Sequence, residues 1–157
     1  MTFASSPYLF SFERAHSDPL AFIPLGVRFY LDLCGMRLTL AQWQALPEPR
    51  RAQLASLEPE FDAAKSSAFE SLLTAAILDV AGGAIERQAP EGVGELAPGD
   101  VPESVISQAA QHGVDALSLK AWSGLSVGQR YALTKLARKA RRSDDFAAAM
   151  TEFGIKG

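Results

Sequence analysis

The chain has 157 residues, 48% of them hydrophobic and 21% charged, with a formal net charge of −3. This composition is typical of a globular protein and argues against a disordered one. The small negative charge gives no overall attraction to phosphate backbones or anionic lipid.

The single cysteine, Cys34, cannot form an intrachain disulfide, which favours a reducing cytoplasm. The N-terminus lacks the basic and apolar regions of a secretory signal. The longest apolar stretch, 72–84, is shorter than the roughly 20 residues that cross a bilayer. We therefore expect a cytoplasmic protein whose residues 1–157 form one domain.

The first predicted helix covers residues 24–34. It is apolar almost all round, which predicts burial, and Gly35 suits the left-handed position after a helix. Thr39 and Gln42 then form a capping box at the start of a short helix, and another helix restarts at Pro49.

A long central helix is predicted next, with a capping box of Ser67 and Glu70 and steady helical spacing of apolar residues. The pair Gly82–Gly83 weakens its end. Residues 88–101 are rich in proline, glycine and acids, and so predict a flexible loop.

The C-terminal part is also predicted to be helical. Asp100 is expected to cap a helix that ends at Gly113, and a short helix follows Ser118. Ser126 then opens a long helix that continues to about Ala140. A last helix starts at Ser143 and stops before Gly154.

Two similar segments, 38–54 and 117–133, each contain one of the two tryptophans, and we call them the tryptophan phrases. Aligning 38–54 with 117–133 gives identity at six of 17 positions, where ordinary composition would supply about one. We interpret residues 24–57 and 102–140 as two three-helix units, joined by the central helix in an all-α bundle with pseudo-twofold duplication. Trp43 and Trp122 would then be equivalent core residues, and Cys34 a buried structural thiol.

Few residues suggest chemistry. The two histidines have no partner at metal-ligand spacing, and no catalytic or nucleotide-binding motif is present. We therefore expect no metal, no cofactor and no catalytic activity, although an enzyme with an apolar pocket stays an open alternative.

One segment, 127–142, carries cations and no acid. Its basic residues either solvate the end of a helix or form a face for an acidic protein or nucleic acid. These residues are Arg130, Lys135, Arg138, Lys139, Arg141 and Arg142.

Three stretches resemble the nitrate reductase-associated protein family. They are FSFERAHSDPLAFIPLGVRFYLDLCGMRLTLAQWQAL at 10–46, LSLKAWSGLSVGQRYALTKLAR at 117–138 and DDFAAAMTEFG at 144–154. They match the family patterns F-x-F-E, IP-x-x-VR-x-x-LD-x-CG and W-x-x-L-x-x-x-QR-x-x-L-x-KL. Leu25 and Tyr30 depart from the family, which has methionine and a basic residue there.

The resemblance implies a non-catalytic accessory or maturation factor of assimilatory nitrate reductase, acting through protein–protein contact. Charged residues of the matching motifs are either buried ion pairs or partner contacts. We take these as candidate partner-binding residues: Glu13, Arg28, Asp32, Arg130, Lys135 and Arg138. The alternative function is a small nucleic-acid-binding regulator that uses the basic 127–142 helix. The oligomeric state and the mode of support are left open.

Overall fold

The computed structural model describes residues 7–15, 18–81, 85–88, 99–114, 117–138 and 144–155. In these residues the chain is mostly helical, as predicted. It divides into two compact units, 1–91 and 92–157. None of the helices in the described segments is long and apolar enough to cross a membrane.

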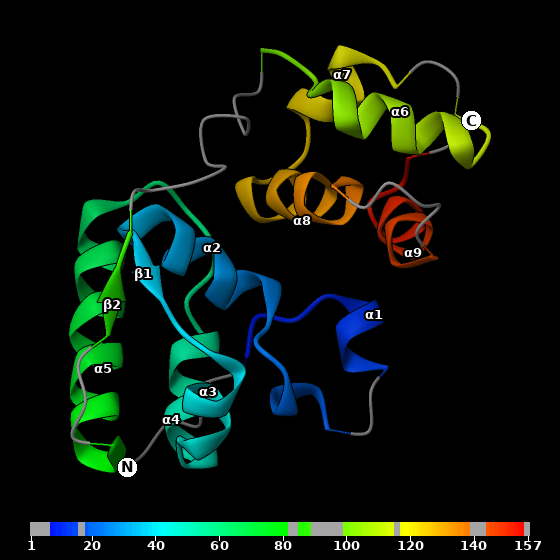
Figure 1. Cartoon of the computed structure of the whole chain (residues 1–157). Coiled ribbons are helices and arrows are strands. Elements are labelled where there is room, and N and C mark those ends of the chain that lie inside the picture. Colours follow the sequence, from blue (N-terminus) through cyan, green and yellow to red (C-terminus); the bar gives the residue numbers. More distant parts are fainter. Residues whose placement is uncertain are drawn as a thin grey trace, which may run out of the picture. The chain divides into compact units, whose positions relative to one another are not determined.

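The first unit is built around its longest helix, α5. The helices α2, α3 and α4 each pack against α5, and α2 also contacts α4; Figure 1 shows α5 at the edge of this group. The helical elements of the unit are α1 (Ser11–Arg14), η1 (Pro19–Ala21), α2 (Leu25–Cys34), α3 (Leu40–Ala45), α4 (Glu48–Ala55) and α5 (Ala63–Ala81).

The start of α5 differs from the prediction. The helix begins at Ala63 because the Asp62 carboxylate accepts hydrogen bonds from the backbone N–H groups of Ala64 (2.8 Å) and Lys65 (3.1 Å). The predicted cap at Ser67 is therefore wrong, and Ser67 lies inside the helix. The whole of α5 belongs to the first unit, and the predicted break at Gly82–Gly83 lies outside the described residues.

A two-stranded ribbon, which was not predicted, closes this unit. β1 (Met36–Arg37) pairs antiparallel with β2 (Glu86–Arg87), with Met36 opposite Arg87. Gly35 ends α2 in the left-handed region (φ 65°), as predicted, and its carbonyl accepts a hydrogen bond from the Gln88 N–H. Two residues are too few for an alternating pattern, which explains why the sequence did not indicate a strand.

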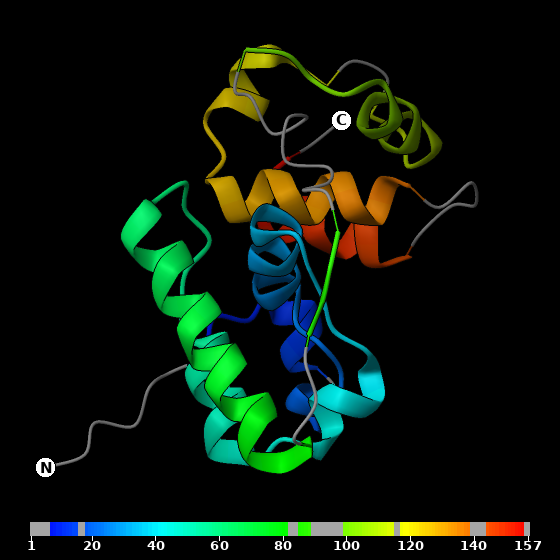
Figure 2. The ribbon, with the colours of Figure 1, turned by 60° about the vertical axis from the view of Figure 1, so that its left-hand side comes forward.

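The second unit is centred on α8, which packs against both α6 and α9; Figure 2 shows α8 and α9 side by side. Its helices are α6 (Glu103–Gln111), α7 (Leu119–Ser123), α8 (Val127–Ala137) and α9 (Asp144–Glu152).

The starts of two helices in this unit were predicted from capping residues. Pro102, and not Asp100, occupies the position before α6, because proline disfavours helical backbone in the residue that precedes it. The capping box of Ser126 and Gln129 is present at the start of α8. The predicted limits at Ala140 and Ser143, and most of the loop 88–101, lie outside the described residues.

Gly113 provides a test of how α6 ends. Its φ of +85° lies in the left-handed region, and a Cβ added there would meet nothing within 4 Å. Gly113→Ala is therefore expected to lower the free energy of unfolding by about 1–2 kcal/mol through backbone strain alone. Gly99→Ala, also into open space but without positive φ, should leave it unchanged or slightly higher. Urea denaturation measures both, and equal effects would contradict this account.

Candidate partner-binding residues

The charged residues singled out in the sequence are divided between the two units. Glu13 lies in α1, and Arg28 and Asp32 lie near the start and the end of α2, all in the first unit. In the second unit, Arg130 and Lys135 lie on α8, and Arg138 follows its last residue. Glu13, Arg28 and Arg130 each form hydrogen bonds to backbone groups of their own unit.

Glu13 connects α1 to α2. Its Oε1 accepts a hydrogen bond from the Phe10 N–H (3.1 Å), and its Oε2 accepts one from the Leu25 N–H (2.9 Å). Leu25 is the first residue of α2, and Pro24 before it offers no side-chain cap. The first N–H groups of a helix lack intrahelical acceptors, so Glu13 supplies the cap from 12 residues away. A carboxylate at this end also suits the helix dipole.

Arg28 reaches back over the start of the same helix. Its Nε donates to the Ile23 carbonyl at 3.3 Å, although the side chain is exposed. Asp32, one turn further along α2, is half-buried. Arg28 thus combines a local backbone contact with an accessible guanidinium.

The Arg28 contact recurs at the start of three other helices. In each, an arginine at the fourth helical position donates to the carbonyl of the apolar residue just before the N-cap. No intrahelical N–H reaches that carbonyl, so the arginine satisfies it. The pairs are Arg14 with Leu9 (3.2 Å), Arg28 with Ile23 (3.3 Å), Arg51 with Leu46 (3.2 Å) and Arg130 with Leu125 (2.5 Å).

Two helices of the first unit converge on one carbonyl group. The Leu20 carbonyl accepts hydrogen bonds from the Trp43 indole (2.8 Å) and from Arg51 Nη1 (2.7 Å). Gln44 donates to the neighbouring Ala21 carbonyl at 2.9 Å. Trp43 is fully buried, so the phrase around it holds the η1 turn against α3 and α4.

The phrase in the second unit has matching local contacts. Ser118 caps α7 by accepting from the Ala121 N–H, as Thr39 caps α3. Trp122 is fully buried, as Trp43 is, and Leu125 is 8% exposed.

Arg130 does not contribute to an exposed basic face. Its side chain is 7% exposed, and burial lowers the pKa of the guanidinium. Lys135 is half-buried with its ammonium 5.6 Å from the centre of the Tyr131 ring, and Arg138 is exposed at the end of α8. The remaining cations of the predicted face, Lys139, Arg141 and Arg142, lie outside the described residues.

Cys34 is half-buried at the end of α2, where its thiol donates to the Ser66 carbonyl at 3.8 Å. Burial raises the pKa of this thiol, and the Glu70 carboxylate raises it further, whereas Arg87 lowers it. A raised pKa disfavours the thiolate, which is the reactive form.

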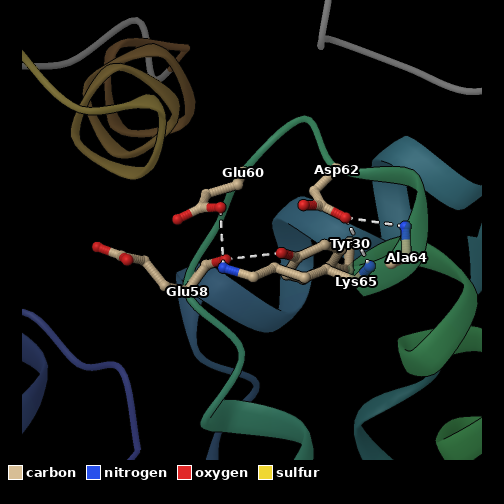
Figure 3. Close-up of polar contacts among 6 residues, drawn as sticks. All are labelled: Tyr30, Glu58, Glu60, Asp62, Ala64 and Lys65. Atoms are coloured by element: carbon tan, nitrogen blue, oxygen red, sulfur yellow. Dashed lines mark hydrogen bonds and ion pairs between the residues drawn. The ribbon is translucent and has the colours of Figure 1, made fainter.

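A cluster around Tyr30 was not expected from the sequence. The Tyr30 hydroxyl donates to the Glu58 carbonyl at 2.6 Å, and Lys65 pairs with Glu60 at 2.8 Å (Figure 3). Tyr30 is fully buried, and this burial raises its pKa. The ring also stacks on Phe69, with centroids 5.3 Å apart. Tyr30 thus anchors the loop before α5. In the sequence, only its position in the apolar pattern of the predicted helix 24–34 indicated that it would be buried.

The comparison with known families agrees with the motifs. The sequence matches the family described as conserved nitrate reductase-associated protein over residues 9–153. The chain belongs to this family. No curated protein and no solved structure matches the chain. Within the described part of the family member, no group of three or more histidine, cysteine, aspartate or glutamate side chains could hold a metal ion.

The family match includes Glu13, Arg28 and Arg130, and the structure gives each a local role. Glu13 caps α2, while the two arginines satisfy the carbonyl groups before α2 and α8. Charged motif residues in this family member therefore need not contact a partner to be explained.

The buried arginine contact can be tested directly. Arg130→Ala leaves the Leu125 carbonyl without its 2.5 Å donor, and we expect it to lower the free energy of unfolding by about 1–3 kcal/mol. The control Arg138→Ala removes an exposed arginine from the same helix and should change it by less than about 0.5 kcal/mol. Chemical denaturation measures both values. Equal losses of stability would show that the hydrogen bond from Arg130 to Leu125 contributes no more than an exposed arginine does.

Proposed function

We propose that this protein is a non-catalytic, cytoplasmic accessory factor that supports assimilatory nitrate reductase by direct contact. The observation that carries the proposal is the family match, which extends over residues 9–153. A protein associated with an enzyme can act through surface recognition alone.

The contact residues that we propose are the charged motif residues with accessible side chains, and each unit contributes its own. Arg28 and Arg138 are exposed, and Asp32 and Lys135 are half-buried. Glu13 and Arg130 hold backbone groups inside their units, and we assign them to the fold. Exposed charges of this kind steer encounter and set specificity more than they add affinity.

We also propose that the two tryptophan phrases are copies of one ancestral unit. Matching features support this: a capping hydroxyl before each short helix, a buried tryptophan within it, and an arginine that returns to the preceding leucine carbonyl. Exposure agrees as well, since Leu40 and Leu119 are both exposed, at 43% and 51%.

The test is capture of purified nitrate reductase, in apo and cofactor-loaded forms, by the immobilised protein. We expect capture by the natural chain and weaker capture by Arg28→Ala and Lys135→Ala, by about threefold to tenfold for each variant. Preferential capture of the apo form would identify a maturation factor, and equal capture a subunit or activator.

A matched control and two contradicting outcomes make the result decisive. Arg14→Ala removes an exposed arginine with the same type of backbone contact as Arg28 and should not weaken capture. If neither form of the reductase is captured at low salt, direct contact is wrong. If the Arg28 and Lys135 variants fold and bind fully, the proposed contact residues are wrong.

A further inference from the structure

The first turn of α2 is covered by a strap, which we define as residues 7–14. The Tyr8 side chain lies against Gly26, because a Cβ added to Gly26 would be 3.3 Å from Tyr8 Cδ1. At the other end of the strap, Glu13 Oε2 accepts a hydrogen bond from the Leu25 N–H at 2.9 Å. Both ends of the strap therefore attach to the same helical turn.

The strap explains why position 26 is a glycine. Gly26 is not among the described glycines with positive φ, and glycine is less favourable than alanine inside a helix. An added Cβ would meet Pro59 Cγ at 3.7 Å, which is ordinary van der Waals contact, whereas 3.3 Å from Tyr8 Cδ1 is tighter than most side chains accept. The helix thus has its least stabilising residue type at the point where the strap needs room.

Contacts within the strap join its two ends. Arg14 donates from Nε to the Leu9 carbonyl (3.2 Å) and from Nη2 to the Pro7 carbonyl (3.3 Å). The rings of Tyr8 and Phe10 meet edge to face, with centroids 5.4 Å apart. Because these contacts are internal to the strap, they hold its shape whether or not it lies on α2, and the strap can move as one body.

The strap buries little side-chain surface. Among residues 7–14, all of which the structure describes, only Phe10 is buried, and α1 contains no buried residue. In α5, by contrast, Phe69 and Leu73 are fully buried. Segments with little burial open locally at a lower free energy than core helices do, so the strap is expected to open while α5 stays folded.

We propose that the strap opens and closes on the first unit as one cooperative body, and that its closure completes the start of α2. Closing brings the Tyr8 ring onto Gly26 and the Tyr8 N–H onto the Ala55 carbonyl at the end of α4 (2.7 Å). In the same step the Glu13 carboxylate caps the Leu25 N–H. Opening exposes these backbone groups to solvent, so the strap is a conformational device that hides or presents them together.

The experiment is native-state hydrogen exchange of the full chain, followed residue by residue by NMR. It compares the Tyr8 and Leu25 amides, which lie far apart in the sequence and whose described acceptors depend on the closed strap. We expect one common protection factor for both amides, because a single opening exposes both. It should be above that of an unstructured chain and below that of the Leu73 amide in α5, which needs a larger unfolding to exchange.

Gly26→Ala tests the contact on which the strap closes. The new Cβ crowds Tyr8 and should lower the protection of the Tyr8 and Leu25 amides together by about threefold or more, while the Leu73 amide keeps its protection. The matched control is Gly124→Ala, whose added Cβ would also have its nearest atom at 3.3 Å, but in the second unit. It should leave both strap-dependent amides unchanged.

A double-mutant cycle separates the strap contact from a general effect on the helix. Tyr8→Ala adds no atoms and should by itself lower the protection of Leu25. With the ring absent, adding Gly26→Ala should cost Leu25 no further protection. Circular dichroism verifies that each variant folds.

Three results would overturn the proposal. The first is clearly different protection of the Tyr8 and Leu25 amides in the natural chain. The second is Leu25 protection equal to that of Leu73, which would mean that the strap opens only when the whole unit unfolds. The third is an equal effect of Gly26→Ala on Leu25 with and without the Tyr8 ring.

Discussion

The fold depends on side chains that close the starts of short helices. α3 and α7 have six and five residues and α4 has eight, whereas isolated helices below about 12–15 residues are marginal in water. Their first N–H groups and the carbonyl groups before them need partners from elsewhere. Thr39, Ser118 and Ser126 supply acceptors, and the arginines at the fourth helical position supply donors.

This constraint separates two kinds of charged residue. Glu13 and Arg130 are fixed by backbone groups that no other side chain near them satisfies in the described contacts. Their substitution would change stability before it changed any contact with another protein. Arg28 and Arg138 keep exposed side chains, and a partner surface is better sought among such residues. Loss of function in a Glu13 variant would therefore not identify a docking residue.

Local patterns in the sequence predicted much of the fold. The helix ending at Gly35 and the capping boxes at Thr39 and Ser126 were predicted because each depends on residues within four positions. Long-range contacts were not predicted. The bond from Leu25 to Glu13 and the one from Tyr30 to Glu58 join residues 12 and 28 positions apart, and no local periodicity indicates them.

The candidate site shows the same limit. Charge alone made Arg130 look like part of a basic face, but its hydrogen bond to Leu125 becomes visible only when the helix start is built. The ribbon of β1 and β2 was missed because a two-residue strand leaves a weak pattern. The cap of α5 at Asp62 was missed because Ser67 offered a second capping residue nearby.

Hydrogen exchange at the Leu25 N–H tests the central claim most directly. This amide is the first of α2, and its described acceptor is Oε2 of Glu13; an N–H at this position has no intrahelical acceptor. The account predicts a slowly exchanging Leu25 amide that becomes fast in Glu13→Ala, while the middle of α2 stays protected. Fast exchange at Leu25 in the natural chain, with α2 otherwise protected, would contradict it.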